Sequence, residues 1–245
     1  MKRFAALATD YDGTIAEGGV VATETAACLM QVKASGRRLI LVSGRTQDCF
    51  DGKGPSPLCF SGISLFDVVV AEDGATMYFP SSGKAVLLAP PVRTEMRSRL
   101  ASSGIEPLWI GACMISTTSQ NAARLEAILG SGPVRYRPEN NRSWVMFNPA
   151  GVSKASGLRA ALRSIGVSPS RTVGMGDSYN DIPFLRLCGI SFAVGDADQP
   201  VRQIASCTTS LPGPAGARQV LQALINNDLH SPSLGTRWTD GRGAA

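Results

Sequence analysis

The chain has 245 residues, of which 44% are hydrophobic and 18% are charged, and its formal net charge is +5. A chain of this length and composition can bury a substantial core, in one large domain or two smaller ones. Its Lys and Arg residues are dispersed, with no basic run interleaved with aromatic residues, so we expect no nucleic-acid partner.

Several classes of protein are excluded by what the sequence lacks. No run approaches the roughly 18 apolar residues of a transmembrane helix, and Asp10 interrupts the N-terminal segment before a signal-peptide core is complete. The six cysteines form no C-x-x-C pair, as is typical of buried thiols in a reducing compartment. We therefore expect a cytoplasmic protein with no membrane partner. Because His230 is the single histidine, the sequence argues against His-based catalysis and favours carboxylate chemistry.

The first part of the chain predicts a βαβ unit. Residues 4–9 (FAALAT) form a short apolar run typical of a buried strand. Residues 23–36 predict a helix with Thr23 as its N-cap and Gly36 at its end. Residues 37–45 predict a second strand. Two strands joined in this way by a helix lie parallel, with a right-handed crossover.

The middle of the chain has a different texture. Residues 67–79 predict a third strand that turns into a hairpin at Asp73 and Gly74. Between residues 84 and 149 the order is helix, strand, strand, helix, strand, strand, which is typical of a small α+β insert. The alternation then returns, with a helix at 153–167, a strand, acidic loop and helix at 171–189, a strand at 190–198, and closing helices at 199–206 and 216–226.

These elements predict an α/β fold with two domains. We expect a Rossmann-like core, a parallel sheet with helices on both faces, made of residues 1–83 and 150–228. Residues 84–149 would form a small inserted α+β cap domain. Residues 229–245 lack periodicity and predict a flexible tail.

Two acidic residues follow the first predicted strand. Asp10 and Asp12 stand two positions apart, followed by Gly13. A calcium loop of the EF-hand type would need Asp or Asn and then Gly where this chain has Thr14 and Ile15, so that interpretation fails. The end of a central strand is where an open α/β sheet places its ligand chemistry. An acidic surface turn is the alternative.

A second acidic loop, GMGDSYND at residues 174–181, follows a later predicted strand. If both loops end neighbouring parallel strands, Asp177 and Asp181 join Asp10 and Asp12 at one edge of the sheet. Two unit charges about 4 Å apart repel by roughly 4 kcal/mol at an effective dielectric near 20. A bound Mg²⁺ would relieve this repulsion, because it prefers carboxylate and carbonyl oxygens. The alternative is an acidic cap on the next helix.

Two further features suit a phosphate group. Ser43 and Gly44 stand between a predicted strand and the segment that follows it, where a hydroxyl and backbone N–H groups can hold an anion. Lys154 begins the helix after the insert, where its positive charge interacts unfavourably with the helix dipole. A role in binding a phosphate group would explain a lysine at this position. A solvent-exposed lysine is the alternative interpretation.

Taken in order, four stretches resemble the four motifs of the haloacid dehalogenase superfamily of phosphatases. The position of the insert, after the third strand, resembles subclass IIB, the Cof-like branch, which also contains sugar-phosphate phosphatases and phosphomannomutases. The chain departs from the usual residues at Tyr11, Asp73, Ala155 and Asp196, but none of these changes removes a reacting group. The stretches are Asp10-Tyr11-Asp12-Gly13-Thr14, Leu41-Val42-Ser43-Gly44-Arg45, Lys154, and Gly176-Asp177-Ser178-Tyr179-Asn180-Asp181.

The resemblance implies specific roles for the acidic residues. Asp10 would attack phosphorus and become an aspartyl-phosphate. Asp12 would protonate the leaving alkoxide and then activate water. Mg²⁺ would be bound by the Asp10 carboxylate, the Asp12 backbone carbonyl and Asp177, with Asp181 supporting them.

The resemblance also implies how the substrate is held. The phosphoryl oxygens would contact Ser43, the Gly44 N–H, Lys154 and Asn180. Arg45 is a further candidate for a substrate contact. So are four residues of the predicted cap hairpin, for which a solvated hairpin is the alternative: Arg137, Asn141, Arg142 and Trp144.

The sequence thus predicts a Mg²⁺-dependent phosphomonoester hydrolase that acts on a small-molecule phosphate ester, a sugar phosphate or a phosphoglycolate-like metabolite. The cap looks shorter than many in this branch, so we expect broad specificity. Three alternatives stay open: a phosphomutase of the same branch, a non-enzymatic phospho-receiver, and an inactive binding protein with this fold.

Overall fold

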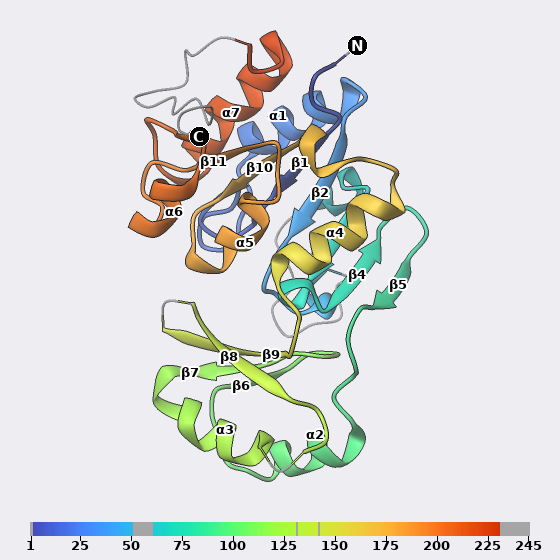
Figure 1. The fold of residues 1–245 in the computed structure, drawn as a ribbon, viewed down its shortest axis with the longest axis vertical. Helices are drawn as coiled ribbons and strands as arrows, with labels where there is room; N and C mark the ends of the chain where they lie inside the picture. Colours follow the sequence, from blue (N-terminus) through green and yellow to red (C-terminus); the bar gives the residue numbers. More distant parts are fainter. Residues whose placement is uncertain (1, 51–60, 131, 142, 231–245) are drawn as a thin grey trace, which may run out of the picture.

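The computed structural model describes residues 2–50, 61–130, 132–141 and 143–230. Most of the predicted tail therefore lies outside the described residues, and so does Arg142, a candidate substrate contact. Figure 1 shows two lobes, a larger one built on an eight-stranded sheet and a smaller one built on a four-stranded sheet. Within the described ranges, every helix is too short or too polar to cross a membrane.

The large sheet is mainly parallel, and β1 lies near its centre. From β1 the chain adds β2 and β3 on one side, and after the insert it returns to add β10, β11 and β12 on the other side. On the β3 side, β4 pairs antiparallel with β3, and the edge strand β5 pairs antiparallel with β4. In sheet order the strands are β12 (Cys207–Thr208), β11 (Ile190–Ala193), β10 (Thr172–Gly176), β1 (Ala6–Thr9), β2 (Arg38–Val42), β3 (Val68–Ala71), β4 (Thr76–Phe79) and β5 (Lys84–Leu87).

Helices cover both faces of this sheet. On one face, α1 (Thr23–Ala34) and α7 (Gly213–Asn227) pack on the core that contains the β1 residue Leu7. On the other, α4 (Lys154–Ser164), α5 (Ile182–Leu185) and α6 (Gln199–Ile204) pack on the core that contains Ala8 of the same strand. Since both faces are covered, β1 is buried along its whole length, as is usual in a parallel sheet. The predicted fold class is confirmed.

The small lobe is an antiparallel sheet covered by two helices. The strand order is β6 (Leu108–Ile110), β7 (Ile115–Thr118), β9 (Trp144–Pro149) and β8 (Tyr136–Asn141). Helices α2 (Thr94–Ala101) and α3 (Ala122–Leu129) pack on one face around a separate core. The sheet lies between these helices and the large lobe (Figure 1). The sequence predicted this order of helices and strands.

Some local predictions were wrong. Thr23 is the first residue of α1 and not its cap; the cap is Ala22, with no side-chain hydrogen bond. The short edge strand β12 was missed, because two residues carry no periodicity. The predicted domain boundaries remain a proposal. We place the start of the insert after β5, because that strand pairs with β4 in the large sheet.

Candidate active site

The candidate site lies at the edge of the large sheet where the central parallel strands end. β1 pairs with β10 on one side and with β2 on the other. Asp10 directly follows β1, Asp177 directly follows β10 and Ser43 directly follows β2. The crevice beside β1, where the order of the strands reverses, is the usual ligand position in an open α/β sheet.

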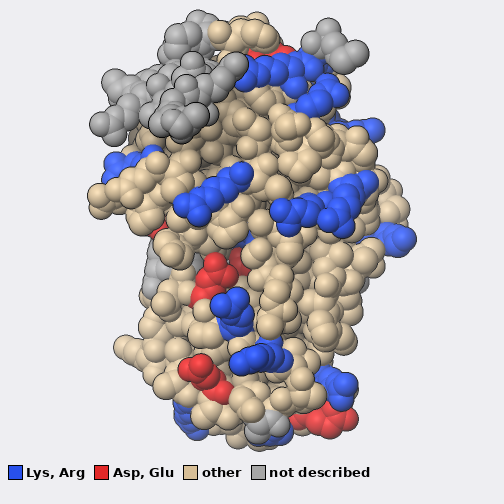
Figure 2. Space-filling view, in the orientation of Figure 1, with Lys and Arg blue, Asp and Glu red and all other residues tan. Residues whose placement is uncertain are grey.

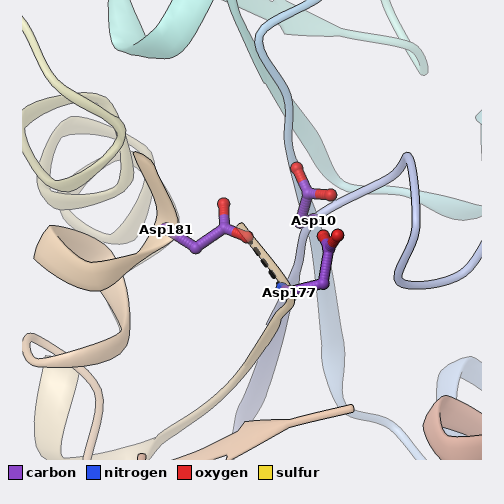
Figure 3. Close-up of side chains that lie close together, drawn as sticks. All are labelled: Asp10, Asp177 and Asp181. Carbon is purple, nitrogen blue, oxygen red and sulfur yellow. Dashed lines mark hydrogen bonds between the residues drawn. The ribbon is translucent and has the colours of Figure 1, made fainter. Parts of the chain in front are cut away.

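Three buried carboxylates meet at this edge (Figure 3). Asp10, Asp177 and Asp181 each offer one oxygen atom, and these oxygens all lie within 4.8 Å of one another. Asp181 accepts hydrogen bonds from the backbone N–H groups of Asp177, at 2.9 Å, and Ser178, at 3.0 Å. Thr14 donates its hydroxyl to Asp177 at 3.1 Å. Burial, followed by the charges of Asp181 and Asp177, raises the pKa of Asp10 well above its usual value.

Gly13 permits the close approach of the first acidic loop to the second. Its φ is +81°, and a Cβ placed there would lie 2.4 Å from Oδ2 of Asp177. Both the backbone conformation and the contact therefore require glycine. Gly13 therefore does more than form a turn, because it also leaves room for the carboxylate of Asp177.

Lys154 lies between two of the carboxylates. Its Nζ is 2.6 Å from Oδ1 of Asp10 and 2.5 Å from Oδ1 of Asp181, and all three side chains are buried. A capping box between Ser153 and Ser156 fixes the start of α4, so Lys154 is its first residue. Burial alone would lower the pKa of the lysine, but the neighbouring carboxylates raise it well above its usual value. The unfavourable position of a cation at a helix N-terminus is thus explained by its carboxylate partners.

The second acidic residue of the first loop has a different environment. Asp12 is half-exposed and is held by Arg45 through two hydrogen bonds, from Nε and Nη2, of 2.7 Å each. The guanidinium also lies 5.2 Å from the centre of the Tyr11 ring. The hydrogen bonds to Asp12 raise the pKa of Arg45. Arg45 lines the cavity, as the sequence suggested, but the partner it has in the structure is Asp12.

A strained turn after β3 joins the two lobes. Glu72 and Asp73 have φ values of 52° and 50°, which are unusual for residues other than glycine, and both are fully buried. The Glu72 carboxylate accepts hydrogen bonds from three successive backbone N–H groups of the small lobe, Ala112 at 2.8 Å, Cys113 at 2.8 Å and Met114 at 2.9 Å. Strained backbone persists only where its surroundings fix it. Here the turn connects the insert to the core.

The neighbouring residue of this turn contacts one of the residues that line the cavity. Asp73 accepts hydrogen bonds from Asn180 at 3.1 Å and from Asn148 of β9 at 3.3 Å. Burial raises its pKa. Gly74 then packs on the start of α4, where a Cβ would lie 2.1 Å from the carbonyl oxygen of Ser153. The turn therefore contacts the small lobe, Asn180 and the helix that carries Lys154.

A cavity of about 520 Å³ lies between the lobes. Its large-lobe side includes six residues that were predicted from the sequence as site residues: Asp10, Asp12, Ser43, Gly44, Lys154 and Asn180. Figure 2 shows acidic side chains at the waist between the two lobes, and basic side chains spread over both lobes on this face. The charged residues that line the cavity, Asp10, Asp12, Arg45 and Lys154, all belong to the large lobe.

Only some of the substrate contacts predicted on the insert lie at the cavity. Trp144 lines the cavity, whereas Arg137 on β8 is exposed and is not among the lining residues. The Arg142 prediction lies outside the described residues. Sequence reasoning missed Trp109 and Met146, which also line the cavity. Their signal was the alternation of side chains along β6 and β9.

Comparisons with known proteins agree with this geometry. Residues 105–219 match the family of haloacid dehalogenase-like hydrolases. A phosphoglycolate phosphatase of Archaeoglobus fulgidus is 27% identical over 227 residues, which cover 89% of this chain and 96% of the relative. A phosphoglycolate phosphatase of Metallosphaera sedula is 25% identical over 228 residues, covering 90% and 98%.

Solved structures share the fold. A haloacid dehalogenase-like hydrolase from Bacteroides thetaiotaomicron superimposes with a TM-score of 0.73 at 16% identity, covering 90% of this chain and 99% of that one. A sugar phosphatase of subclass IIB gives a TM-score of 0.67 at 17% identity, covering 89% and 97%. The predicted resemblance to the haloacid dehalogenase-like hydrolases is therefore confirmed.

Proposed function

We propose that this protein is a Mg²⁺-dependent phosphomonoester hydrolase that acts on a small phosphorylated metabolite through an aspartyl-phosphate on Asp10. The observation that carries the proposal is the buried group of Asp10, Asp177 and Asp181 with Lys154 between two of them. Carboxylates are brought together in this way, against their repulsion, where a site needs them. The phosphatase relatives support the same class of reaction.

The donor set fits a hard divalent cation. Three buried carboxylates and one ammonium leave an excess of formal negative charge, and carboxylate oxygens are the ligands that Mg²⁺ prefers. Asp10, Asp177 and the backbone carbonyl of Asp12 would hold the ion. Asp181, whose oxygens accept from two N–H groups and Lys154, would keep the loop in place. When bound, Mg²⁺ supplies charge that stabilises the phosphoryl oxygens in the transition state.

Four groups would hold the phosphoryl group. Ser43, Gly44, Lys154 and Asn180 line the same cavity as Asp10. The Ser43 oxygen already accepts from the Arg45 N–H at 3.1 Å, so its proton is available to a phosphoryl oxygen. The amide nitrogen of Asn180 donates a hydrogen bond to the carboxylate of Asp73. Such preorganised donors act where charge develops in the transition state.

The reaction then takes two steps. A carboxylate oxygen of Asp10 bonds to phosphorus while the bond to the leaving oxygen breaks, and Asp12 gives that oxygen a proton. Water then attacks phosphorus and passes a proton to Asp12, and the bond from Asp10 to phosphorus breaks. Because both steps use Asp12, Arg45 must hold its carboxylate in reach without keeping it from the leaving oxygen.

The test is phosphate release from a panel of phosphomonoesters. Wild type with Mg²⁺, wild type with EDTA, and Asp10→Asn with Mg²⁺ are compared. We expect release by wild type and none in the other two arms. A hexose 1-phosphate in the panel identifies the mutase outcome, because a mutase converts it to the 6-phosphate without net release. Absence of release from every ester would contradict the proposal.

A further inference from the structure

One face of the small sheet is turned toward the cavity. Along β9, Val145 and Phe147 pack into the core beneath α2 and α3, whereas Trp144 and Met146 line the cavity. This alternation follows from the two-residue period of a strand. The face of this sheet that α2 and α3 do not cover therefore lines the cavity of the candidate active site.

The same face continues across the neighbouring strands. Trp109 of β6 lies opposite Ser116 of β7, and Ser116 lies opposite Met146 of β9, so these three residues form a row across the sheet. The rings of Trp109 and Trp144 are 6.5 Å apart between centroids and tilted by 48°. Trp109 is 37% exposed. Tryptophan is costly to leave exposed, since its burial contributes strongly to core and interface energies.

Charge separates the two ends of the cavity. Among the described residues that line it, the cations are Arg45, paired with Asp12, and Lys154, paired with Asp10 and Asp181. The described lining residues of the small lobe, which include Trp109, Ser116 and Met146, are uncharged. An anionic leaving group would therefore meet no unpaired cation among the described residues that line the cavity.

We propose that Trp109, Trp144 and Met146 form a leaving-group subsite for an uncharged ring. The substrates would be phosphate esters whose leaving group presents a flat apolar face, either an aromatic ring or one face of a sugar ring, and carries no negative charge. Aromatic side chains bind such rings by stacking or edge contacts, and the thioether adds a polarisable contact. This inference rests on the proposed function and specifies its substrate class.

The subsite distinguishes this chain from a protein built for 2-phosphoglycolate, whose leaving group carries a carboxylate. The relatives that bear that name share about a quarter of their residues with this chain. Leaving-group selectivity resides in side chains that line the cavity, and these can differ within one fold. The row of Trp109, Ser116 and Met146 is the feature of this chain that favours a ring.

The first experiment compares kcat/KM of the wild type, with Mg²⁺, for four esters. Phenyl phosphate and glucose 6-phosphate carry uncharged rings, glycerol 3-phosphate carries a small uncharged group, and 2-phosphoglycolate carries a carboxylate. We expect the better of the two ring esters to exceed 2-phosphoglycolate by about tenfold or more. Which ring ester is preferred separates an aromatic from a carbohydrate leaving group.

The second experiment changes the rings. Trp109→Ala and Trp144→Ala should each lower the ratio of kcat/KM for the preferred ring ester to that for glycerol 3-phosphate by about tenfold. Trp109→Phe and Trp144→Phe keep a ring and should restore most of the ratio. Met30→Ala, which truncates an exposed apolar side chain on α1, is the matched control and should leave the ratio unchanged.

Two results overturn the inference while leaving the proposed function intact. One is 2-phosphoglycolate being hydrolysed as efficiently as the ring esters. The other is an unchanged ratio in alanine variants that have the same melting temperature as wild type. If an alanine variant fails to fold, the wild-type comparison of the ring esters with 2-phosphoglycolate decides alone. No release from any ester overturns the proposed function itself, so the two failures are distinguishable.

Discussion

The two sides of the cavity are built on different principles. On the large lobe, charged side chains stand at the ends of parallel strands and are paired: the buried Asp10 and Asp181 with Lys154, and the half-exposed Asp12 with Arg45. On the small lobe, tryptophan, methionine and serine side chains stand on one face of an antiparallel sheet.

This difference follows from the two kinds of sheet. A parallel sheet with helices on both faces has only its strand ends available for a ligand, and loops there can carry converging polar groups. An antiparallel sheet can bury one face and leave the other open, so its open face can take part in a site. In this molecule we assign the chemistry to the strand ends and the selectivity to the open face.

The largest expected effect is on the charged side. Asp177→Asn removes one carboxylate from the cluster while keeping its shape, so it should weaken Mg²⁺ binding and lower kcat by about a hundredfold or more. Phosphate release measured against Mg²⁺ concentration tests this. Glu24→Gln, which removes an exposed carboxylate from α1, is the control and should behave as wild type. An Asp177→Asn enzyme with an unaltered Mg²⁺ requirement would assign the metal elsewhere.

Lys154→Met should affect the stability of the protein as well as its activity. It leaves Asp10 and Asp181 buried without the ammonium, which typically costs about 3 kcal/mol, together with a loss of activity. Mg²⁺ should raise the melting temperature of this variant more than that of wild type, because it supplies the missing positive charge. Thermal unfolding with and without Mg²⁺ provides the measurement. Equal Mg²⁺ effects on the two proteins would argue against an ion beside these carboxylates.

Glu72→Gln tests the connection between the two sides. The amide has one acceptor oxygen where the carboxylate has two, so at least one buried N–H of the small lobe loses its partner, at a cost of about 2 kcal/mol. The two lobes should then be held less firmly, and KM should rise by a larger factor than kcat falls. Glu126→Gln, exposed on α3, is the matched control. A fall in kcat alone would show that the turn serves the chemistry and not the placement of the insert.

The smallest effect lies away from the cavity. Burial of Asp67 opposes its ionisation, but hydrogen bonds from Lys33, the Leu39 N–H and Arg38 outweigh burial and lower its pKa. The carboxylate therefore stabilises the fold above its unfolded pKa, and this contribution disappears as the pH falls through the folded value. Asp67→Asn should lower stability by about 1 kcal/mol or less near neutral pH. The difference from wild type should vanish in acid, which thermal unfolding across pH can follow; a difference that persisted in acid would have another origin.

The large-lobe side of the cavity could be predicted because its motifs are local. The strings around Asp10, Ser43 and Asp177 each follow an apolar run, and parallel strands bring such ends together. Lys154 could be predicted as a site residue because a cation at the first position of a helix interacts unfavourably with the helix dipole. The fold class followed from the alternation of elements along the chain.

The small-lobe side could not be predicted in the same way. Trp109 and Trp144 stand on β6 and β9, which are not adjacent strands, and only the order β6-β7-β9-β8 brings their rings together. The hydrogen bonds of Glu72 reach backbone groups about 40 residues away, for which no side-chain pattern exists. Arg45 and Asp12 are likewise joined only by the neighbouring positions of β1 and β2.

The role of Asp10 as the nucleophile is tested most directly by trapping the covalent intermediate. Wild type mixed with Mg²⁺ and its best ester is quenched rapidly and treated with borohydride, which reduces an aspartyl-phosphate to homoserine, and the product is mapped by mass spectrometry. If Asp10 is the nucleophile, homoserine should appear at position 10 and depend on both Mg²⁺ and substrate. Turnover with no change at position 10, or with the change at another carboxylate, would contradict it.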